Sequence, residues 1–348
     1  MCTKRTWAEI DLSAVRNNFM AISEYAKRPI IAVVKADAYG HGAAQLARIY
    51  EELGACMLAV ATVSEADDLR ASGISGDILI FGRTAPCDIR AGYVQAVFSL
   101  EYARELAEYA PKTRVHVKID TGMGRVGVRT PDEVAEIAKM LPAEGVFTHL
   151  ADADNENSAY TEQQIARFND VILKSGVAFR IRHASASTGV LHFENARFDA
   201  VRPGLILYGL YPDARHESLA LQPVMSLKTR VMDVRSICAG ESVSYGRTYT
   251  AARDMRVAVL PIGYADGLPR SLSNSGEVLL HGTRVPIIGR ICMDMCMVDV
   301  SACENVQCGD VCEVFGRGIS ADELAVKTGT ISYEIVTGVS KRAVRVTI

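Results

Sequence analysis

Residues 31–42 read Ile-Ala-Val-Val-Lys-Ala-Asp-Ala-Tyr-Gly-His-Gly, so an apolar strand delivers Lys35 into a turn that carries Tyr39. A lysine that closes a buried strand loses hydration, which disfavours the ammonium form and lowers its pKa from about 10.4. Such a lysine forms an imine with a carbonyl cofactor such as pyridoxal phosphate, and Tyr39 with nearby backbone amides is available to the phosphate. Spacing alone fits at least as well a lysine whose ammonium stays in water, so the rest of the chain has to distinguish the two interpretations.

The elements around that lysine alternate between strand and helix patterns from about residue 30 to residue 210. Apolar strands are predicted at 30–35, 56–62, 77–82, 95–100, 113–119, 144–149, 178–183 and 198–202. Helical patterns lie between them, at 41–54, 64–73, 88–94, 101–110, 131–141, 158–176 and 189–193, with candidate N-caps at Ser64, Thr130 and Ser158. This repeated alternation predicts an α/β fold with a (β/α)8 TIM barrel. An open doubly wound sheet would have fewer strands and a glycine-rich phosphate turn after the first.

The active site of such a barrel lies at the carboxyl ends of its strands. Polar residues stand at or near five of these ends, namely Lys35, Lys118, Arg125, His149, Ser187 and Arg202. One histidine or one charged residue at a strand end is usually a hydrogen-bonded structural group. Six polar residues on one rim favour a functional site.

The pattern changes past residue 220 to alternating segments without helices between them. These segments are 224–237, 242–250, 255–262, 277–280, 284–300, 309–315 and 331–346, and only 320–329 is predicted to be helical. The sequence therefore predicts a mostly β second domain, with which the alternating N-terminal residues 5–12 are expected to pair. We place the barrel domain at 9–220 and the β domain at 221–348 together with 1–8, with a ligand cleft where they meet.

Composition excludes several classes of function. The 348 residues include 38 Lys and Arg against 41 Asp and Glu, and a net charge of −3 gives no reason to bind nucleic acid or an anionic membrane. No apolar run approaches the roughly 18 residues that span a bilayer and none follows Met1, so we expect a cytoplasmic protein. The nine cysteines are irregularly spaced, none as C-x-x-C and none with a histidine locally paired, so we expect reduced thiols and no metal site.

The chain as a whole resembles the alanine racemases, pyridoxal-phosphate enzymes of fold type III with a barrel and a β domain. Seven motifs carry the resemblance in register, namely Ala32–Gly42, Lys118–Gly127, Phe147–His149, Val201–Gly204, Val243–Gly246, Ile262–Gly267 and Gly289–Asp294. One of them alone, such as Gly-Tyr-Ala-Asp-Gly, could be an ordinary turn. Seven together are specific to the family.

The resemblance implies racemisation of L-alanine and D-alanine by two bases, one on each face of the α-carbon. These bases are Lys35 and Tyr245. Tyr245 then needs a pKa below its usual value of about 10, and the resemblance places His149 and Arg202 in a network with it. Without the family, Tyr245 would be interpreted as a half-buried strand tyrosine.

Arg202 is implied to lie beside the pyridine nitrogen of the cofactor. An arginine stays protonated and can only donate, so it opposes protonation of that nitrogen and leaves the ring a weak electron sink. Return of the proton to the α-carbon is then favoured over transamination. Most pyridoxal enzymes have a carboxylate at this nitrogen instead.

The remaining roles also follow from the resemblance. The cofactor-binding residues are Lys35, Tyr39, His149, Ser187, Arg202, Gly204, Leu205 and Tyr333. The substrate carboxylate is implied to meet Arg125 and the Met293 amide, and Tyr264 and Asp294 line the approach. Lys118 matches a lysine that is carbamylated in some relatives, where it then pairs with the arginine equivalent to Arg125.

Two positions depart from the family pattern. Ala186 stands where relatives commonly carry asparagine, and Lys341 stands where several have a tyrosine near the phosphate. Neither is one of the two implied bases, so the departures bear on affinity and substrate preference.

The family also implies a homodimer with Tyr245 acting across the interface, and a role in supplying D-alanine for peptidoglycan. A serine racemase or a racemase of broad specificity remains open, because a pocket distinguishes only weakly between two side chains that differ by one hydroxyl. A non-catalytic pyridoxal-phosphate carrier would lack the β domain and Tyr245. A decarboxylase of related fold would have an acidic residue where this chain has Arg202.

Overall fold

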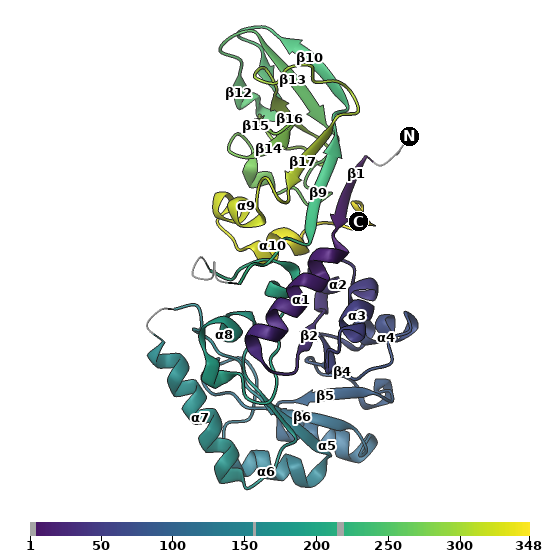
Figure 1. Cartoon of the computed structure of the whole chain (residues 1–348), viewed down its shortest axis with the longest axis vertical. Coiled ribbons are helices and arrows are strands. Elements are labelled where there is room, and N and C mark those ends of the chain that lie inside the picture. The colour runs from purple at the N-terminus through teal and green to yellow at the C-terminus, as the bar shows by residue number, and fades with distance from the viewer. Residues whose placement is uncertain (1–4, 156–157, 214–218) are drawn as a thin grey trace. The chain divides into compact units, whose positions relative to one another are not determined.

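The computed structural model describes residues 5–155, 158–213 and 219–348 (Figure 1). It divides into two compact units. The barrel unit comprises Val15–Ala38 and Gly42–Leu221, and the β unit comprises Met1–Ala14, Tyr39–His41 and Gln222–Ile348.

The barrel unit is built on a parallel sheet whose first three strands are wholly apolar, as expected for strands buried on both faces, whereas the later strands also carry polar residues such as Gln95 and His116. Within the described residues its seven strands pair in chain order: β2 (Ile31–Val33), β3 (Met57–Val60), β4 (Ile78–Ile80), β5 (Tyr93–Val97), β6 (Arg114–Lys118), β7 (Ala143–Phe147) and β8 (Ile181–His183). This order confirms the predicted strands, with β5 beginning two residues before its predicted start.

The predicted eighth strand is present only as a short closing segment. Val201 forms a parallel bridge with Ile30. The N–H groups of Ile31 and Val33 donate to the carbonyl oxygens of Val201 (2.8 Å) and Pro203 (3.1 Å). Pro203 accepts the bond from Val33 but has no N–H group to donate in return, which explains why no regular strand forms here. The same segment also bonds to the other edge of the sheet, since the N–H groups of Ala200 and Arg202 donate to the carbonyl oxygens of Arg182 (3.3 Å) and Ser185 (2.8 Å). The segment thus joins β8 to β2 and closes the sheet, which confirms the predicted barrel fold.

Helices follow most of the strands, and α5 packs beside α6 and α6 beside α7 (Figure 1). The helices and 3-10 turns are α1 (Leu12–Ala26), α2 (Lys35–Tyr39), α3 (Ala43–Glu52), α4 (Val63–Ala71), η1 (Pro86–Asp88), α5 (Leu100–Tyr109), α6 (Pro131–Met140), α7 (Ala159–Ser175), α8 (Ser187–His192), η2 (Glu194–Ala196) and η3 (Leu205–Tyr208). The sequence did not predict α1, and the predicted helix at 88–94 is wrong, because only η1 and the start of β5 lie there.

The helix caps agree with the sequence in part. Thr130 caps α6 through a capping box with Glu133, as predicted. The cap of α4 is Thr62 rather than Ser64, because Thr62 pairs with Glu65 in the same kind of box. Ser158 occupies the N-cap position of α7 but makes no capping hydrogen bond through its side chain.

The β unit contains a sheet of nine strands among the described residues, in the order β10-β13-β16-β15-β14-β17-β9-β1-β18. The strands of the unit are β1 (Thr6–Ile10), β9 (Met225–Arg230), β10 (Asp233–Ile237), β11 (Ser242–Val243), β12 (Tyr249–Thr250), β13 (Met255–Leu260), β14 (Glu277–Leu280), β15 (Thr283–Ile288), β16 (Cys296–Asp299), β17 (Val311–Phe315) and β18 (Val344–Thr347). The N-terminal strand β1 pairs antiparallel with β9 and parallel with β18, which confirms its predicted pairing with this domain.

Two short helices and two 3-10 turns complete the β unit, namely α9 (Ala321–Thr328), α10 (Ser332–Thr337), η4 (Tyr245–Arg247) and η5 (Arg270–Leu272). Helix α9 was predicted, but the strand predicted from residue 331 is wrong at its start, where α10 forms. The buried residues of α10 are Ser332, Ile335 and Val336. Their spacing of three and four residues is that of a helix face, and it was the missed signal.

The cysteine cluster belongs to the β unit. Cys296, Cys303 and Cys312 are buried, and burial raises the pKa of Cys296 to about 12, so it stays a thiol. No group of three or more His, Cys, Asp or Glu residues in the described part of the chain lies close enough together to hold a metal ion. Across the same residues, no helix has the length and apolar character needed to cross a bilayer.

Candidate active site

The turn that carries Lys35 has an unusual backbone. Ala36, Asp37, Ala38 and Tyr39 all have left-handed φ angles, of 51°, 53°, 53° and 54°. Left-handed backbone costs an L-residue roughly 1–2 kcal/mol, so four such residues in succession persist only when the surroundings impose them. Asp37 supplies one support, since its Oδ1 accepts a hydrogen bond from the N–H of Ala43 at 2.7 Å.

The Lys35 side chain is half-buried at the carboxyl end of β2. Burial, and then the positive charge of Arg125, lower its pKa, while Glu65 opposes this shift. A lysine with a lowered pKa supplies neutral amine more readily near neutral pH, and neutral amine is the form that reacts with carbonyls or accepts a proton. The pKa of Lys35 is thus lowered, as predicted, while its reaction with a carbonyl stays a prediction.

Arg202 follows the closing segment of the barrel and is 3% exposed. Its Nη1 lies 2.7 Å from Nδ1 of His183, and its Nη2 donates to the carbonyl oxygens of Thr148 (2.7 Å) and Ala184 (2.9 Å). Burial lowers the pKa of Arg202 to about 9, so it remains a cation near neutral pH. A guanidinium has five N–H groups, and three bonds go to partners in the described residues, so two N–H groups remain for a ligand acceptor.

Three further predicted residues lie in the same electrostatic environment. Burial, and then Arg125 and Arg202, lower the pKa of Lys118 to about 8. Burial and the charges of Arg202, Arg125, Lys118 and Lys35, in that order, lower the pKa of His149 to about 3, so this imidazole is neutral. Four cations thus act on one histidine at the carboxyl rim of the barrel, and such a rim favours anionic groups.

Ser187, Gly204 and Leu205 meet at the starts of α8 and η3. The Oγ of Ser187 accepts hydrogen bonds from the backbone N–H groups of Gly204 (3.1 Å) and Ile206 (3.4 Å). Its own hydroxyl proton is then free to point to a ligand, next to the backbone N–H groups at the start of η3. Ala186 is the N-cap residue of α8 and makes no capping bond, which is the local consequence of the departure at this position.

The β unit presents three large predicted site residues to solvent. Tyr245 is 71% exposed, Met293 53% and Tyr264 44%. The loops that carry Tyr264 and Met293 are joined, since the N–H of Tyr264 donates to the carbonyl oxygen of Cys292, the residue before Met293, at 3.2 Å. A side chain at Gly263 would lie 2.3 Å from the Met293 carbonyl oxygen, so only glycine permits this approach. The unit therefore holds Tyr264 and Met293 on adjoining loops.

Asp294 and the two tyrosines Tyr39 and Tyr333 also belong to the β unit. Asp294 accepts a hydrogen bond from Nη2 of Arg342 at 2.8 Å, which neutralises its charge. The rings of Tyr39 and Tyr333 lie 5.9 Å apart between centroids, and burial, together with Tyr333, raises the pKa of Tyr39. Lys341 is exposed.

The sequence-predicted residues thus fall into two groups. The barrel unit contains Lys35, Lys118, Arg125, His149, Ser187, Arg202, Gly204 and Leu205, all at or after the carboxyl ends of strands. The β unit contains Tyr39, Tyr245, Tyr264, Met293, Asp294 and Tyr333. Two residues were missed: His183, which contacts Arg202, and Glu65, which acts on Lys35. His183 stands at the carboxyl end of the predicted strand 178–183, and this position, shared with the predicted site residues, was the signal that could have identified it.

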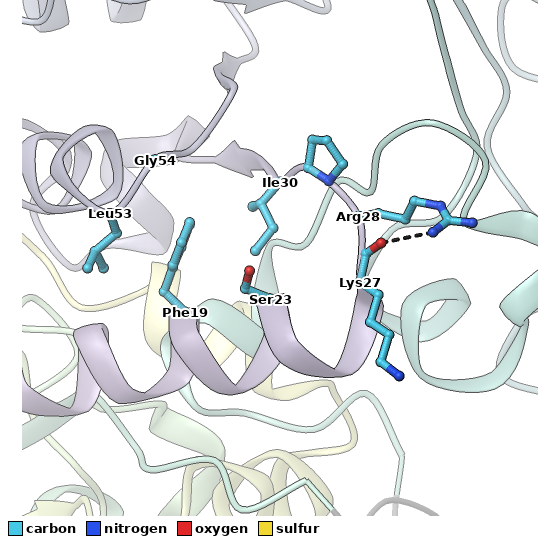
Figure 2. Close-up of a pocket in the computed structure, with 8 residues that line it drawn as sticks. Phe19, Ser23, Lys27, Arg28, Ile30, Leu53 and Gly54 are labelled. Carbon is cyan, nitrogen blue, oxygen red and sulfur yellow. Dashed lines mark hydrogen bonds between the residues drawn. The ribbon is translucent and has the colours of Figure 1, made fainter.

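A hollow of about 270 Å³ in the barrel unit lies at the opposite, amino end of β2 (Figure 2). Its lining residues in the described part of the chain are Phe19, Ser23, Lys27, Arg28, Pro29, Ile30, Leu53 and Gly54. Arg28 there donates to the Lys27 carbonyl oxygen at 2.9 Å. None of the predicted site residues is among them, so this hollow is separate from the candidate site.

Comparisons with known proteins agree with the geometry. The family model "Alanine racemase, N-terminal domain" matches residues 10–212, and "Alanine racemase, C-terminal domain" matches residues 224–347. The alanine racemase of Methanococcus maripaludis is 42% identical over 372 aligned residues, covering 99% of each chain.

Solved structures are similar over the same length. The alanine racemase of Clostridium difficile 630 has a TM-score of 0.95 and 36% identity, covering 100% of this chain and 97% of that one. The alanine racemase of Bacillus anthracis, solved with bound L-Ala-P, has a TM-score of 0.93 and 36% identity, covering 100% of this chain and 96% of that one.

Proposed function

Because the chain belongs to the alanine racemase family, we propose that it interconverts L-alanine and D-alanine with pyridoxal 5′-phosphate as its cofactor. The observation that carries the proposal is the cationic rim of the barrel, where Lys35, Lys118, Arg125 and Arg202 all act on His149. A phosphate and a substrate carboxylate are both anions, and this rim suits both. The enzyme is accordingly an isomerase that acts on an amino acid.

The barrel residues fit this cofactor. The Ser187 hydroxyl, which Gly204 and Ile206 hold through their N–H groups, and the Leu205 N–H would bind the phosphate. Lys35 would bind the carbonyl carbon of the cofactor's aldehyde. Arg202, with two N–H groups remaining, would donate to the pyridine nitrogen. When bound, the cofactor withdraws electrons from the α-carbon of an amino acid and makes its α-proton acidic.

Lys35 and Tyr245 are the two proposed bases. One removes the proton from the α-carbon on one face, and the other returns a proton on the opposite face. The lowered pKa of Lys35 supports its role, because neutral amine accepts a proton without first losing one. Arg202 stays cationic near neutral pH and, as a donor only, would hold the pyridine nitrogen unprotonated, which favours return of the proton to the α-carbon.

The substrate carboxylate is proposed to bind Arg125 and the Met293 amide, with Tyr264 and Asp294 along the approach. Lys118 is proposed to react with carbon dioxide through its neutral amine and become an anion that pairs with Arg125. Its lowered pKa of about 8 supports this proposal, because the amine is partly neutral at physiological pH. Tyr39 and Tyr333 are proposed to contribute to the phosphate site.

A homodimer in which Tyr245 acts across the interface, on the substrate held beside the partner's Lys35, completes the proposal. The 71% exposure of Tyr245 supports it, since a base must be enclosed with its substrate and this side chain is open on its own subunit. We also propose that the barrel domain at 9–220 binds the cofactor, that the β domain at 221–348 with 1–8 supplies Tyr245, and that the enzyme makes D-alanine for peptidoglycan in the cytoplasm.

The function is tested by α-proton exchange in deuterium oxide on the purified holoenzyme, with L-alanine and L-serine offered separately and optical rotation followed in parallel. Wild type should exchange and invert alanine faster than serine. Tyr245→Phe should lose inversion by about 10²–10⁴-fold, the usual worth of a general acid or base. Tyr249→Phe, a matched change four residues along the chain, should not. Faster serine turnover would reassign the substrate, and cofactor binding without exchange would overturn racemisation.

The dimer is tested by mixing two inactive variants, Lys35→Ala and Tyr245→Phe. If Tyr245 acts across the interface, each mixed dimer has one site with both wild-type bases, and activity returns to about a quarter of wild type. If both bases come from one subunit, the mixture stays inactive.

A further inference from the structure

Two histidines with no place in the proposed reaction lie inside the barrel. His116, in β6, and His183, in β8, are both 0% exposed. Nδ1 of His116 lies 2.8 Å from Nε2 of His183, and Nδ1 of His183 lies 2.7 Å from Nη1 of Arg202. The three side chains form one continuous line of hydrogen bonds, which begins at the candidate site and runs into the barrel interior.

The chemistry of the groups determines the direction of every bond in this line. A guanidinium can only donate, so Nδ1 of His183 must accept from Arg202. Burial lowers the pKa of both imidazoles, so each is neutral and has a single N–H. The proton of His183 is therefore on Nε2 and is donated to Nδ1 of His116, which places the proton of His116 on its own Nε2.

A carboxylate lies near this last N–H. Oε1 of Glu144 is 3.7 Å from Nε2 of His116, which is too long for a hydrogen bond, so the N–H has no hydrogen-bond acceptor among the described residues and the contact is electrostatic. Although burial raises the pKa of Glu144, its interactions with His116 and Arg114 lower it to about 2, so the group is an anion. Arg114 holds the carboxylate with two hydrogen bonds, of 2.9 and 2.8 Å. Both ring protons are thus on the nitrogen farther along the line from Arg202, and the line ends beside a negative charge.

The backbone of β7 is adapted to this arrangement. The pairing of β6 with β7 runs from Val115 opposite Ala143 to His116 opposite Gly145, so Glu144 is an extra residue on β7. A Cβ at Gly145 would lie 2.4 Å from Nε2 of His116. Gly145 has no left-handed φ, so the glycine is needed for space and not for conformation. The irregularity and the glycine together make room for the His116 ring and bring the carboxylate to it.

We propose that His116, together with Glu144, is a positioning residue that fixes the tautomer of His183 and thereby holds Arg202 in a single donor arrangement. His116 contacts neither proposed base, and it acts only through His183. If His183 moved its proton to Nδ1, that N–H would face a donor of Arg202, and the arginine would have to turn. The last step, from Arg202 to the pyridine nitrogen, rests on the proposed function, whereas the tautomers do not.

The first test uses the protein without cofactor. NMR of apoprotein labelled with ¹⁵N-histidine distinguishes a protonated ring nitrogen from an unprotonated one, and variants lacking His116 or His183 assign the signals. We expect the proton on Nε2 in both residues. A proton on Nδ1 of His183, or a mixture of its tautomers, would overturn the proposal whatever the protein catalyses.

The second test compares four variants for the His183 tautomer, the Kd of pyridoxal phosphate for apoprotein and resistance to urea. His116→Leu should disturb the tautomer and raise the Kd by about 10–100-fold, the worth of a hydrogen bond that orients a charged group. Gly145→Ala should do the same by displacing the ring. His116→Asn should restore most of the affinity, because Asn Oδ1 takes the place of Nδ1 as the acceptor.

Val117→Ala is the control, because Val117 is a buried core residue next to His116 in β6. It should lower stability and leave the tautomer and the Kd unchanged. If His116→Leu likewise lowered stability and left the His183 tautomer and the Kd unchanged, His116 would be merely structural and the proposal would be wrong. Wild-type apoprotein that failed to bind pyridoxal phosphate would instead contradict the proposed function, while the NMR result would still decide the tautomers.

Discussion

Oε1 of Glu65 lies 2.7 Å from the backbone nitrogen of Ala36, the residue after Lys35. The other oxygen of the same carboxylate accepts the N–H of Ala61 at 2.7 Å. Ala36 follows β2 and Ala61 follows β3, so Glu65 connects the turns after two neighbouring strands. The left-handed turn that presents Lys35 is thus held from outside, by a residue of α4.

Glu65→Gln should weaken this connection and lower the pKa of Lys35 further, because the negative charge that opposes the downward shift is removed. The free energy of unfolding should fall by about 0.5–1.5 kcal/mol, the usual net worth of a hydrogen bond, because the donors of Ala36 and Ala61 are exposed or only partly buried. Urea unfolding measures the change in stability, and the pH dependence of acetylation of Lys35 in the apoprotein measures the change in its pKa.

Glu51→Gln is a matched control, since Glu51 accepts the backbone N–H groups of Ser75 (3.0 Å) and Gly76 (2.5 Å) in the same way. It should lower stability and leave the acetylation profile of Lys35 unchanged. Equal acetylation profiles for both variants would show that Glu65 does not shift the pKa of Lys35.

Ala36→Gly should stabilise the protein by about 1 kcal/mol, because Ala36 is exposed and has a φ of 51°, which glycine adopts without steric cost. Ala107→Gly, inside α5, should destabilise it by about the same amount. Thermal unfolding of the apoproteins measures both changes. A loss of stability at both positions would mean that the surroundings of Ala36 do not impose the left-handed backbone.

The stability of the apoprotein should depend on Lys118 between pH 8 and pH 10.5. The pKa of Lys118 is about 8 in the folded state against an ordinary value of 10.5. Between these values the unfolded chain binds a proton that the folded chain does not, so the free energy of unfolding rises with pH, by about 3 kcal/mol at most.

Lys118→Met should lack this rise and should be more stable than wild type near pH 7, where wild type has an uncompensated buried cation. Urea unfolding of both proteins across this pH range, in buffer free of carbon dioxide, measures the difference. Parallel curves for the two proteins would contradict the lowered pKa.

Bicarbonate labelled with ¹³C should add one carbamate signal to the NMR spectrum of the wild-type protein. The signal should be absent from Lys118→Arg, which keeps the charge but cannot form the carbamate. It should grow as the pH rises through about 8, because only the neutral amine reacts. A signal of equal size in Lys118→Arg would assign the carbamate to another lysine.

Arg125→Gln should raise the KM for alanine by about 10–100-fold, since a charged hydrogen bond to a carboxylate is worth about 1.5–3 kcal/mol. Arg129→Gln is the control, because Arg129 is committed to Asp120 at 2.7 Å in the same loop region. Initial-rate kinetics with both variants compare the two arginines. A similar rise in KM for both would mean that only the net charge of the loop matters.

Much of the barrel could be predicted from local pattern. Strands that are buried on both faces are apolar runs, and their alternation with helical segments indicates a barrel. Prediction failed where few residues decide the structure. The eighth strand is reduced to a bridge at Val201, since Pro203 has no N–H group to donate to the ladder, and α10 replaces a predicted strand because its buried residues are spaced as on a helix face.

The sequence by itself determined which residues stand at the carboxyl ends of the strands, Lys35 and Arg202 among them, because strand direction and order follow from the chain. Only the tertiary structure decided that His116 and His183, 67 residues apart, meet inside the barrel and connect Arg202 to Glu144. Their contact depends on the curvature of the closed sheet, on an extra residue in β7 and on the space left by Gly145. None of these is visible in local periodicity, which reports burial but not which buried groups face each other.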